Sequence, residues 1–297
     1  MPDPSPSRQF TAQGTTRLEL LKAASHYLQL SGVEDSAVHA EFLLGHILTL
    51  SRAELHLNGG HTVGPEAVHQ FEAMVTRRGH GEPTQYIAGE TEFYGLPFTC
   101  DRRALIPRPE TELLVDGVLR FAQAAAGSPF SICDLGTGSG CIGVSVAVNA
   151  PNVTVVAVDL YPGALDLARH NAARHDVVSR IDFRQSDLFA GVSESFDLIA
   201  ANLPYVPSVD RTVLQREVRD WEPASALFAG TDGLEFLEPA IRQSPDHLRP
   251  GGHLLLEIGA GQLAPVLGLI HATAGFKEIT HRADYQGHPR VVTAERV

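Results

Sequence analysis

Cysteine is scarce in this chain, with only Cys100, Cys133 and Cys141 among 297 residues. So small and odd a number excludes a disulfide-rich secreted framework and favours a reduced, cytoplasmic protein. Long hydrophobic runs are also missing, because no apolar stretch approaches the ~18 residues that a membrane span requires. The polar, proline-rich residues 1–14 contain no signal-peptide core, and we expect them to form a disordered tail.

Positive charge is in deficit, since 23 Lys and Arg face 35 Asp and Glu and the formal net charge is −12. No basic cluster is large enough for phosphate contacts, so we expect no stable nucleic-acid partner, and no membrane partner either. The 14 histidines form neither a His-Glu-x-x-His motif nor a cysteine-paired spacing, which predicts that there is no metal site. A hydrophobic content of 43% is typical of a globular protein with a sizeable core.

The most informative segment that is present is the turn Asn202-Leu203-Pro204-Tyr205, which follows the apolar run 196–201. The Asn202 amide oxygen and the Leu203 carbonyl can accept two hydrogen bonds from one planar NH2 group. Pro204 restrains the preceding residue to an extended conformation, and Tyr205 offers a ring face for stacking. These four residues therefore predict a catalytic and substrate-binding site that holds an amide or amino nitrogen as a nucleophile.

A glycine-rich loop between a strand-like run and a helix-like stretch predicts a cofactor site, because glycine permits positive φ and close approach of a ligand. Asp159 ends the next strand run, where it can accept hydrogen bonds from the hydroxyls of a ribose. Two cofactors fit the loop: a dinucleotide, through Gly138-x-Gly140-x-x-Gly143, or S-adenosylmethionine, through Asp134-x-Gly136-x-Gly138-x-Gly140. The two acceptors for an NH2 group, the Asn202 amide oxygen and the Leu203 carbonyl, are called the clamp below. They favour S-adenosylmethionine, since an NAD enzyme has no use for such a clamp. The candidate cofactor-binding residues are Asp134, Gly136, Thr137, Gly138, Ser139, Gly140, Asp159 and Asn202.

Periodicity divides the chain into three parts after the tail. Apolar residues recur at three-to-four spacing through residues 15–80, with glycine-containing breaks, which predicts four or five short helices. Aromatic residues on both sides of Gly95 predict a β-hairpin. We place a helical substrate-recognition domain at 15–85, a hairpin linker at 86–104 and the catalytic domain at 105–297.

The catalytic domain alternates between helical and strand-like patterns, which is typical of an α/β fold with a parallel sheet covered on both faces. A helix is expected over residues 110–126, before the first strand run. The expected strands are 130–135, 153–158, 180–185, 196–201 and 252–258, followed by a terminal pair at 276–281 and 291–295.

Several further segments, added to these motifs, make the chain similar to a known family from about residue 17 to its end. They are Arg77-Arg78 with Gly81-Glu82-Pro83, residues 92–96, residues 105–112, Trp221-Glu222-Pro223, and Asp284-Tyr285 with Gly287 and Arg290. With the glycine loop and the 202–205 turn, they resemble the protein-glutamine methyltransferases that modify the Gly-Gly-Gln glutamine of bacterial peptide chain release factors.

The resemblance implies a seven-stranded class I methyltransferase domain of Rossmann-like fold, behind a small α-helical bundle and a β-hairpin. It implies S-adenosylmethionine as the cofactor, with Asp187 and Leu188 beside the adenine, and methyl transfer to the side-chain amide nitrogen of a release-factor glutamine. The family's turn is Asn-Pro-Pro-Tyr, so Leu203 is a departure. Because the second residue acts through its carbonyl, we expect the function to survive. We also expect a monomer whose helical domain binds the release factor.

Other interpretations of the same residues stay open at this stage. An exocyclic adenine amine fits the same clamp, so an adenine-amino methyltransferase acting on nucleic acid is the alternative function, although the chain lacks a basic surface. A binding module that keeps the cofactor fold without catalysis is a third class, which the intact Asn202 and Tyr205 disfavour. Asp159 could instead cap the helix that begins near Pro162, and Asp187 could be a solvated loop carboxylate.

Overall fold

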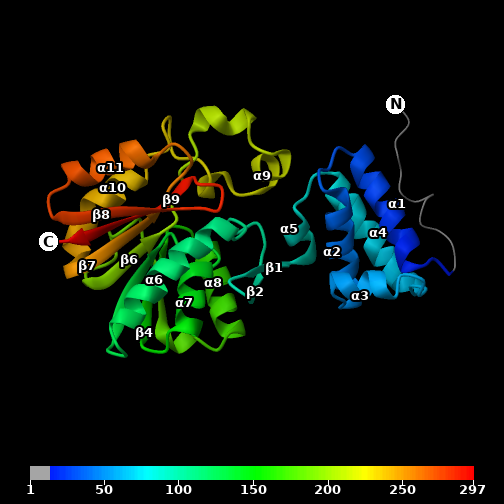
Figure 1. Ribbon diagram of the computed structural model, residues 1–297, viewed down its shortest axis with the longest axis horizontal. Helices are drawn as coiled ribbons and strands as arrows, with labels where there is room; N and C mark the ends of the chain where they lie inside the picture. The colour runs from blue at the N-terminus through cyan, green and yellow to red at the C-terminus, as the bar shows by residue number, and fades with distance from the viewer. Residues whose placement is uncertain (1–13) are drawn as a thin grey trace. The chain divides into compact units, whose positions relative to one another are not determined.

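The computed structural model describes residues 14–297, so the predicted tail lies outside the described residues except for Gly14. The chain forms two compact units (Figure 1). The first contains the residues up to Gly89 together with Gln215–Trp221, and the second contains Glu90–Leu214 and Glu222–Val297. The segment Gln215–Trp221 thus clusters with the helical unit although it lies within the range expected for the catalytic domain. Its Glu217 forms an ion pair with Arg78, whose side chain is buried.

The first unit is helical, as the spacing of its apolar residues predicts. Local signals start its helices: Thr16 and Ser51 form capping boxes, and Pro65 occupies a first-turn position. The apolar faces of these helices meet in one core that includes Leu28, Leu43 and Phe71. The helices before Gly89 are α1 (Arg17–Leu30), α2 (Ser36–Leu48), α3 (Arg52–Leu57), α4 (Pro65–Gly79) and α5 (Thr84–Ala88), and the later segment adds α9 (Arg216–Trp221).

The predicted hairpin is present at the start of the second unit. Strand β1 (Glu90–Phe93) pairs antiparallel with β2 (Leu96–Thr99). The turn between them has positive φ at both Tyr94 and Gly95, a conformation that glycine adopts at little cost. Phe93 and Phe98 are buried from the two strands and pack edge to face in the core of this unit.

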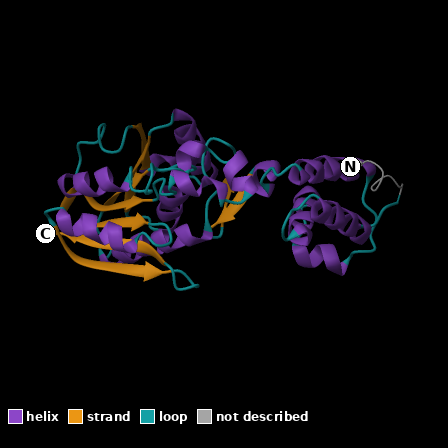
Figure 2. Cartoon of the chain, turned by 90° about the horizontal axis from the view of Figure 1, so that it is seen from above, coloured by secondary structure: helices purple, strands orange, loops and turns teal. Residues whose placement is uncertain are grey.

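The second unit is built on a seven-stranded sheet with the strand order β5-β4-β3-β6-β7-β9-β8. The strands of this sheet are among those drawn in orange in Figure 2. Its first five strands in sequence run parallel, and the terminal pair is antiparallel. The strands are β3 (Phe130–Leu135), β4 (Val153–Asp159), β5 (Ile181–Gln185), β6 (Phe196–Ala201), β7 (Leu248–Glu257), β8 (Phe276–Ala283) and β9 (Pro289–Arg296). Strand β7 begins four residues before the predicted start, because Leu248 already pairs with Phe196 ahead of a register shift.

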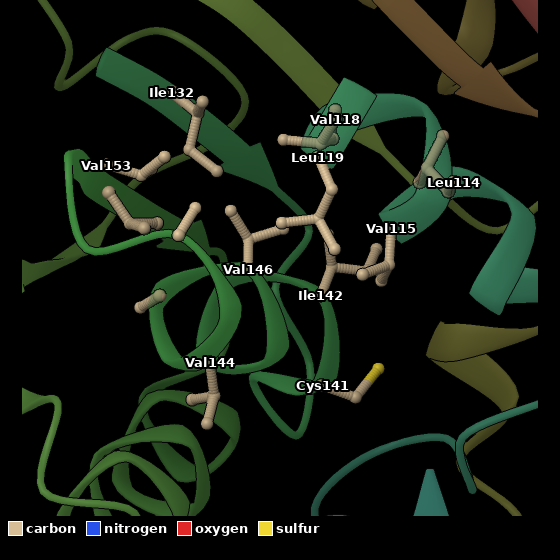
Figure 3. Packing of buried hydrophobic residues seen from close by; sticks show 14 of the residues in the cluster. Leu114, Val115, Val118, Leu119, Ile132, Cys141, Ile142, Val144, Val146 and Val153 are labelled. Carbon is tan, nitrogen blue, oxygen red and sulfur yellow. The ribbon is translucent and has the colours of Figure 1, made fainter. Parts of the chain in front are cut away.

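Helices cover both faces of this sheet, as expected for an α/β fold (Figure 1). Alternate strand residues point to opposite faces, so Ile132 and Cys133 enter different apolar clusters. One cluster packs against α6 and α7, and Figure 3 shows Ile142 and Val146 of α7 facing α6. The other cluster packs against α10 and α11. The helices are α6 (Glu112–Ala124), α7 (Cys141–Asn149), α8 (Pro162–Arg174), α10 (Leu237–Gln243) and α11 (Leu263–Ala272).

Within residues 14–297, no helix is both long and apolar enough to cross a membrane. Over the same residues, no group of three or more His, Cys, Asp or Glu side chains is arranged to hold a metal ion.

Candidate active site

Sheet order and register bring the predicted motifs together at the carboxyl ends of the parallel strands in the second unit. The chain runs from β3 outward to β4 and β5, then returns to place β6 on the other side of β3, and such a switch point is where open α/β sheets bind ligands. Leu135 pairs with Val158 on one side and with Ala201 on the other. The residues that come next along these three strands are Asp159, Gly136 and Asn202, so they emerge side by side.

A cavity opens at the carboxyl ends of these strands, and many of the predicted site residues line it. Gly136, Gly138 and Asp159 contribute from the first two strand ends. Other parts of the lining come from residues 103–105, 225–226, Pro223 and Phe236. The predicted residues that line the cavity are Gly136, Gly138, Asp159, Asp187, Leu188, Asn202, Leu203 and Pro204. Asp134, Thr137, Ser139, Gly140 and Tyr205 do not line it.

The glycine loop has the backbone that its sequence predicts, with φ values of +75°, +56° and +81° at Gly136, Gly138 and Gly140. Each glycine has a different neighbour. A Cβ on Gly136 would lie 2.8 Å from Cδ2 of Leu203, and one on Gly140 would lie 3.0 Å from Cβ of Ala168 in α8. A Cβ on Gly138 would meet nothing nearer than 3.8 Å. Gly138 thus leaves room at the cavity, Gly136 allows Leu203 to pack against the loop, and Gly140 allows α7 and α8 to pack.

Asp134 supports the loop from behind the cavity wall. It is fully buried, and its Oδ2 accepts hydrogen bonds from Thr137 Oγ1 at 2.6 Å and from the Gly143 amide at 3.0 Å. Burial raises the pKa of this carboxyl to about 6. Ser139 is also beneath the surface, and its carbonyl accepts a hydrogen bond from the buried Asn171. The acid and the polar residues of the motif therefore shape the loop instead of facing the cavity.

Asp159 is the carboxylate that faces the cavity. Its Oδ2 accepts from the Gly138 amide and its Oδ1 from the Tyr161 amide, both at 2.9 Å. Burial raises its pKa above the ordinary range for aspartate. Tyr161 is the N-cap of α8, so Asp159 lies two residues before the capping position. A carboxylate has about four lone pairs, so both oxygens can still accept from ligand hydroxyls.

The residues after β5 that line the cavity combine polar and apolar groups. Asp187 is exposed at the cavity, and Leu188 beside it is half-buried with a φ of +45°. Phe236 is a second apolar side chain that lines the cavity. Ser186 is buried, and its hydroxyl accepts from the Gly191 amide at 2.7 Å, which holds the turn after β5. The side chains of Asp187, Leu188 and Phe236 are suited to contact a flat ring with polar atoms along one edge.

The Asn202 side chain is oriented by a hydrogen bond to Thr111, a residue outside the predicted site. Asn202 Nδ2 donates to Thr111 Oγ1 at 3.0 Å, an interaction that sets the amide plane and directs Oδ1 away from Thr111. Leu203 is buried beside Gly136, so its side chain has a packing role that the sequence analysis did not assign. Tyr205 is half-buried outside the cavity lining, and its hydroxyl donates to Glu257 Oε1 at 3.2 Å.

Two buried carboxylates that the sequence analysis left unassigned also organise the site. Glu222 accepts from the Ile106 amide and forms an ion pair with Arg108, so it joins two segments whose neighbouring residues line the cavity. Glu257 ends β7 within an otherwise apolar run and is 1% exposed. An ionisable residue inside such a run is the sequence signal that could have identified Glu257.

Comparison with known proteins agrees with this geometry. The family described as PrmC N-terminal domain matches residues 19–89, and the family described as Methyltransferase small domain matches residues 111–219. The T. thermophilus 16S rRNA N2 G1207 methyltransferase, solved with AdoMet and guanosine, has a TM-score of 0.51 and 16% identity, covering 70% of this chain and 50% of its own. This similarity supports the methyltransferase fold of the second unit.

Curated relatives are similar over most of the chain. The release factor glutamine methyltransferase of Geobacter sulfurreducens is 41% identical over 90% of this chain and 92% of its own length. The protein of the same name from Cereibacter sphaeroides is 42% identical over 93% of this chain and 97% of its own length. Identity at this level across both units confirms the resemblance predicted from the motifs. The chain therefore belongs to the release factor glutamine methyltransferase family.

Proposed function

We propose that this enzyme transfers a methyl group from S-adenosylmethionine to the side-chain amide nitrogen of the Gly-Gly-Gln glutamine in peptide chain release factors. The observation that carries the proposal is the position of Asn202. Its amide is oriented by Thr111, and it lines the same cavity as the glycine loop and Asp159. An acceptor for an NH2 group thus lines the same cavity as the residues that would bind the cofactor. Family membership supports the same substrate and cofactor.

The residues around the cavity fit S-adenosylmethionine. Gly136 and Gly138 present backbone without side chains, and the Asp159 carboxylate can accept from two ribose hydroxyls. Leu188 and Phe236 provide apolar contacts for an adenine ring, with Asp187 available to accept from an amino group. When bound, S-adenosylmethionine supplies a methyl group activated by a positively charged sulfur.

The clamp addresses the low nucleophilicity of an amide nitrogen, whose lone pair is delocalised into its carbonyl. Asn202 Oδ1 and the Leu203 carbonyl each accept one N–H of the glutamine, which turns the nitrogen toward the methyl group and favours a tetrahedral geometry. Such positioning by oriented acceptors lowers the barrier without a strong base. Pro204 restrains Leu203, and Tyr205 supports the turn through its hydroxyl contact with Glu257.

The helical unit is the part that we assign to recognition of the release factor. It has its own core, and the cavity described above lies wholly in the second unit. Deleting residues 1–89 should leave S-adenosylmethionine binding intact and greatly raise the KM for intact release factor. Unchanged KM in a truncated protein that circular dichroism shows to be folded would restrict this unit to a structural role.

The activity is tested by mass spectrometry of a release factor incubated with the enzyme and S-adenosylmethionine. The peptide that contains the Gly-Gly-Gln glutamine should gain one methyl group, and a release factor with this glutamine changed to alanine is the matched control. Methyl transfer to adenine in DNA or RNA, with none to the release factor, would overturn the proposal in favour of the adenine-amino alternative.

A further inference from the structure

Glu257 occupies the same row of the sheet as the site residues. Ala201 is the register partner of Leu256 in β7, so Glu257 follows the pair at the level where Asn202 follows β6. The neighbouring side chains from Leu254 to Ile258 are otherwise apolar and buried. Placing a carboxyl at such a position is costly unless it is compensated by hydrogen bonds. The hydrogen-bond partners of Glu257 therefore indicate why a carboxyl is present there.

Both contacts of Glu257 lead to the clamp. The Tyr205 hydroxyl donates to its Oε1 at 3.2 Å. The Thr111 hydroxyl lies close enough to lower the pKa of the carboxyl by hydrogen bonding, while it accepts from Asn202 Nδ2. Oε2 has no hydrogen-bond partner of good geometry in the described chain. One carboxyl thus connects to Asn202 through Thr111 and to Tyr205 directly.

Burial dominates the titration of Glu257 and raises its pKa to about 7. Of the charged groups that face it, Arg290 of β9 lowers its pKa and Glu110, just before α6, raises it. The Cys141 thiol of α7, with a pKa raised to about 12, stays neutral. Tyr205 has a pKa raised by burial, with Glu257, Arg290 and Arg108 facing it, and it also stays protonated. Glu257 is therefore the member of this group that changes charge near neutral pH.

We propose that Glu257 is a positioning residue for methyl transfer, whose ionised carboxylate orients Asn202 through Thr111 and Tyr205 directly. The proposal rests on the proposed function for its catalytic consequence. An ionised carboxylate only accepts hydrogen bonds, so both hydroxyls donate to it and each takes one orientation. A protonated carboxyl must also donate, which removes an acceptor from one of the two hydroxyls. The orientations of Asn202 and Tyr205 thus both depend on one buried negative charge.

The kinetic test compares the parent enzyme with Glu257→Gln, which keeps the shape but cannot ionise. We expect kcat for release factor to fall about tenfold to a hundredfold, as for a small misplacement of a reacting group, with the KM for S-adenosylmethionine unchanged. The parent kcat should decrease as the pH is lowered through about 7, and the variant should show no such step. The matched control is Asp197→Asn, since Asp197 accepts from Ser131 at the opposite end of the sheet. This control should lose stability while keeping kcat and its pH profile.

A second measurement does not depend on activity. The side-chain amide signal of Asn202 in a nitrogen-15 spectrum, assigned by its loss in Asn202→Ala, should shift with a midpoint near pH 7 in the parent. It should not shift with that midpoint in Glu257→Gln, or in Thr111→Val, which serves if the first variant fails to fold.

The outcomes separate the two proposals. A parent-like kcat and pH profile in folded Glu257→Gln, or an Asn202 signal that does not titrate in the parent, overturns the role of Glu257 and leaves methylation of the release factor intact. A titrating Asn202 signal in a parent enzyme that methylates no release factor overturns the proposed function alone.

Discussion

Gly136→Ala tests whether the cofactor loop and the clamp are mechanically coupled through Leu203. The substitution forces an L-residue to keep a φ of +75°, at a cost of about 1–2 kcal/mol. Its Cβ would also lie 2.8 Å from Leu203 Cδ2, and such overpacking adds about 1–3 kcal/mol. We expect a loss of roughly 2–5 kcal/mol in the free energy of unfolding. Turnover should also fall, because Leu203 must move and its carbonyl is half of the clamp.

The assay is a double-mutant cycle with Leu203→Val, which removes the atom that would clash. Leu203→Val alone should cost roughly 1 kcal/mol, and the double variant should recover about 1–2 kcal/mol relative to the sum of the single changes. Gly138→Ala is the matched control, because its Cβ has no neighbour within 3.8 Å and only the backbone term remains. Additivity within about 0.5 kcal/mol by urea denaturation would refute the coupling.

Three further substitutions test the clamp and the cofactor site, and a fourth tests a buried charge. Asn202→Ala should lower single-turnover methyl transfer by about 10²–10³ while cofactor affinity stays near that of the parent; parent-like transfer would contradict the clamp. Asp159→Ala should weaken S-adenosylmethionine binding in calorimetry, because both the ribose acceptors and the contact with the Gly138 amide are lost. Leu203→Pro should retain turnover but lower the denaturation midpoint, since the leucine side chain is buried; loss of turnover would mean that this side chain has a direct role. Glu257→Gln should stabilise the fold by up to about 3 kcal/mol at pH 8 and less toward pH 5, because a folded pKa near 7 against an ordinary 4.5 makes ionisation destabilising as pH rises between them; a parent-like pH dependence of the unfolding free energy would contradict this.

Patterns along the chain were enough to predict its helices and strands and the chemistry of its local motifs. Strand runs such as 130–135 and 196–201 coincide with β3 and β6, because alternating or continuous apolar residues select these conformations wherever the strands pair. The positive φ at Gly136 follows from its residue type and its place after a strand. The Asn202 turn indicated an NH2 acceptor without any knowledge of its neighbours. Family motifs then supplied the cofactor and the substrate.

The residues that support the site could be identified only in the folded protein, because their contacts join positions far apart in the chain. Asn202 meets Thr111 across 91 residues, and Glu222 meets the Ile106 amide across 116. Periodicity reports which face of an element is apolar but not which element lies beside it. The order β4-β3-β6-β7 sets those neighbours, and it brings Glu257 beneath the clamp. A hydrogen bond between distant residues exists only once the sheet has placed its two partners within reach, so no local pattern could have predicted it.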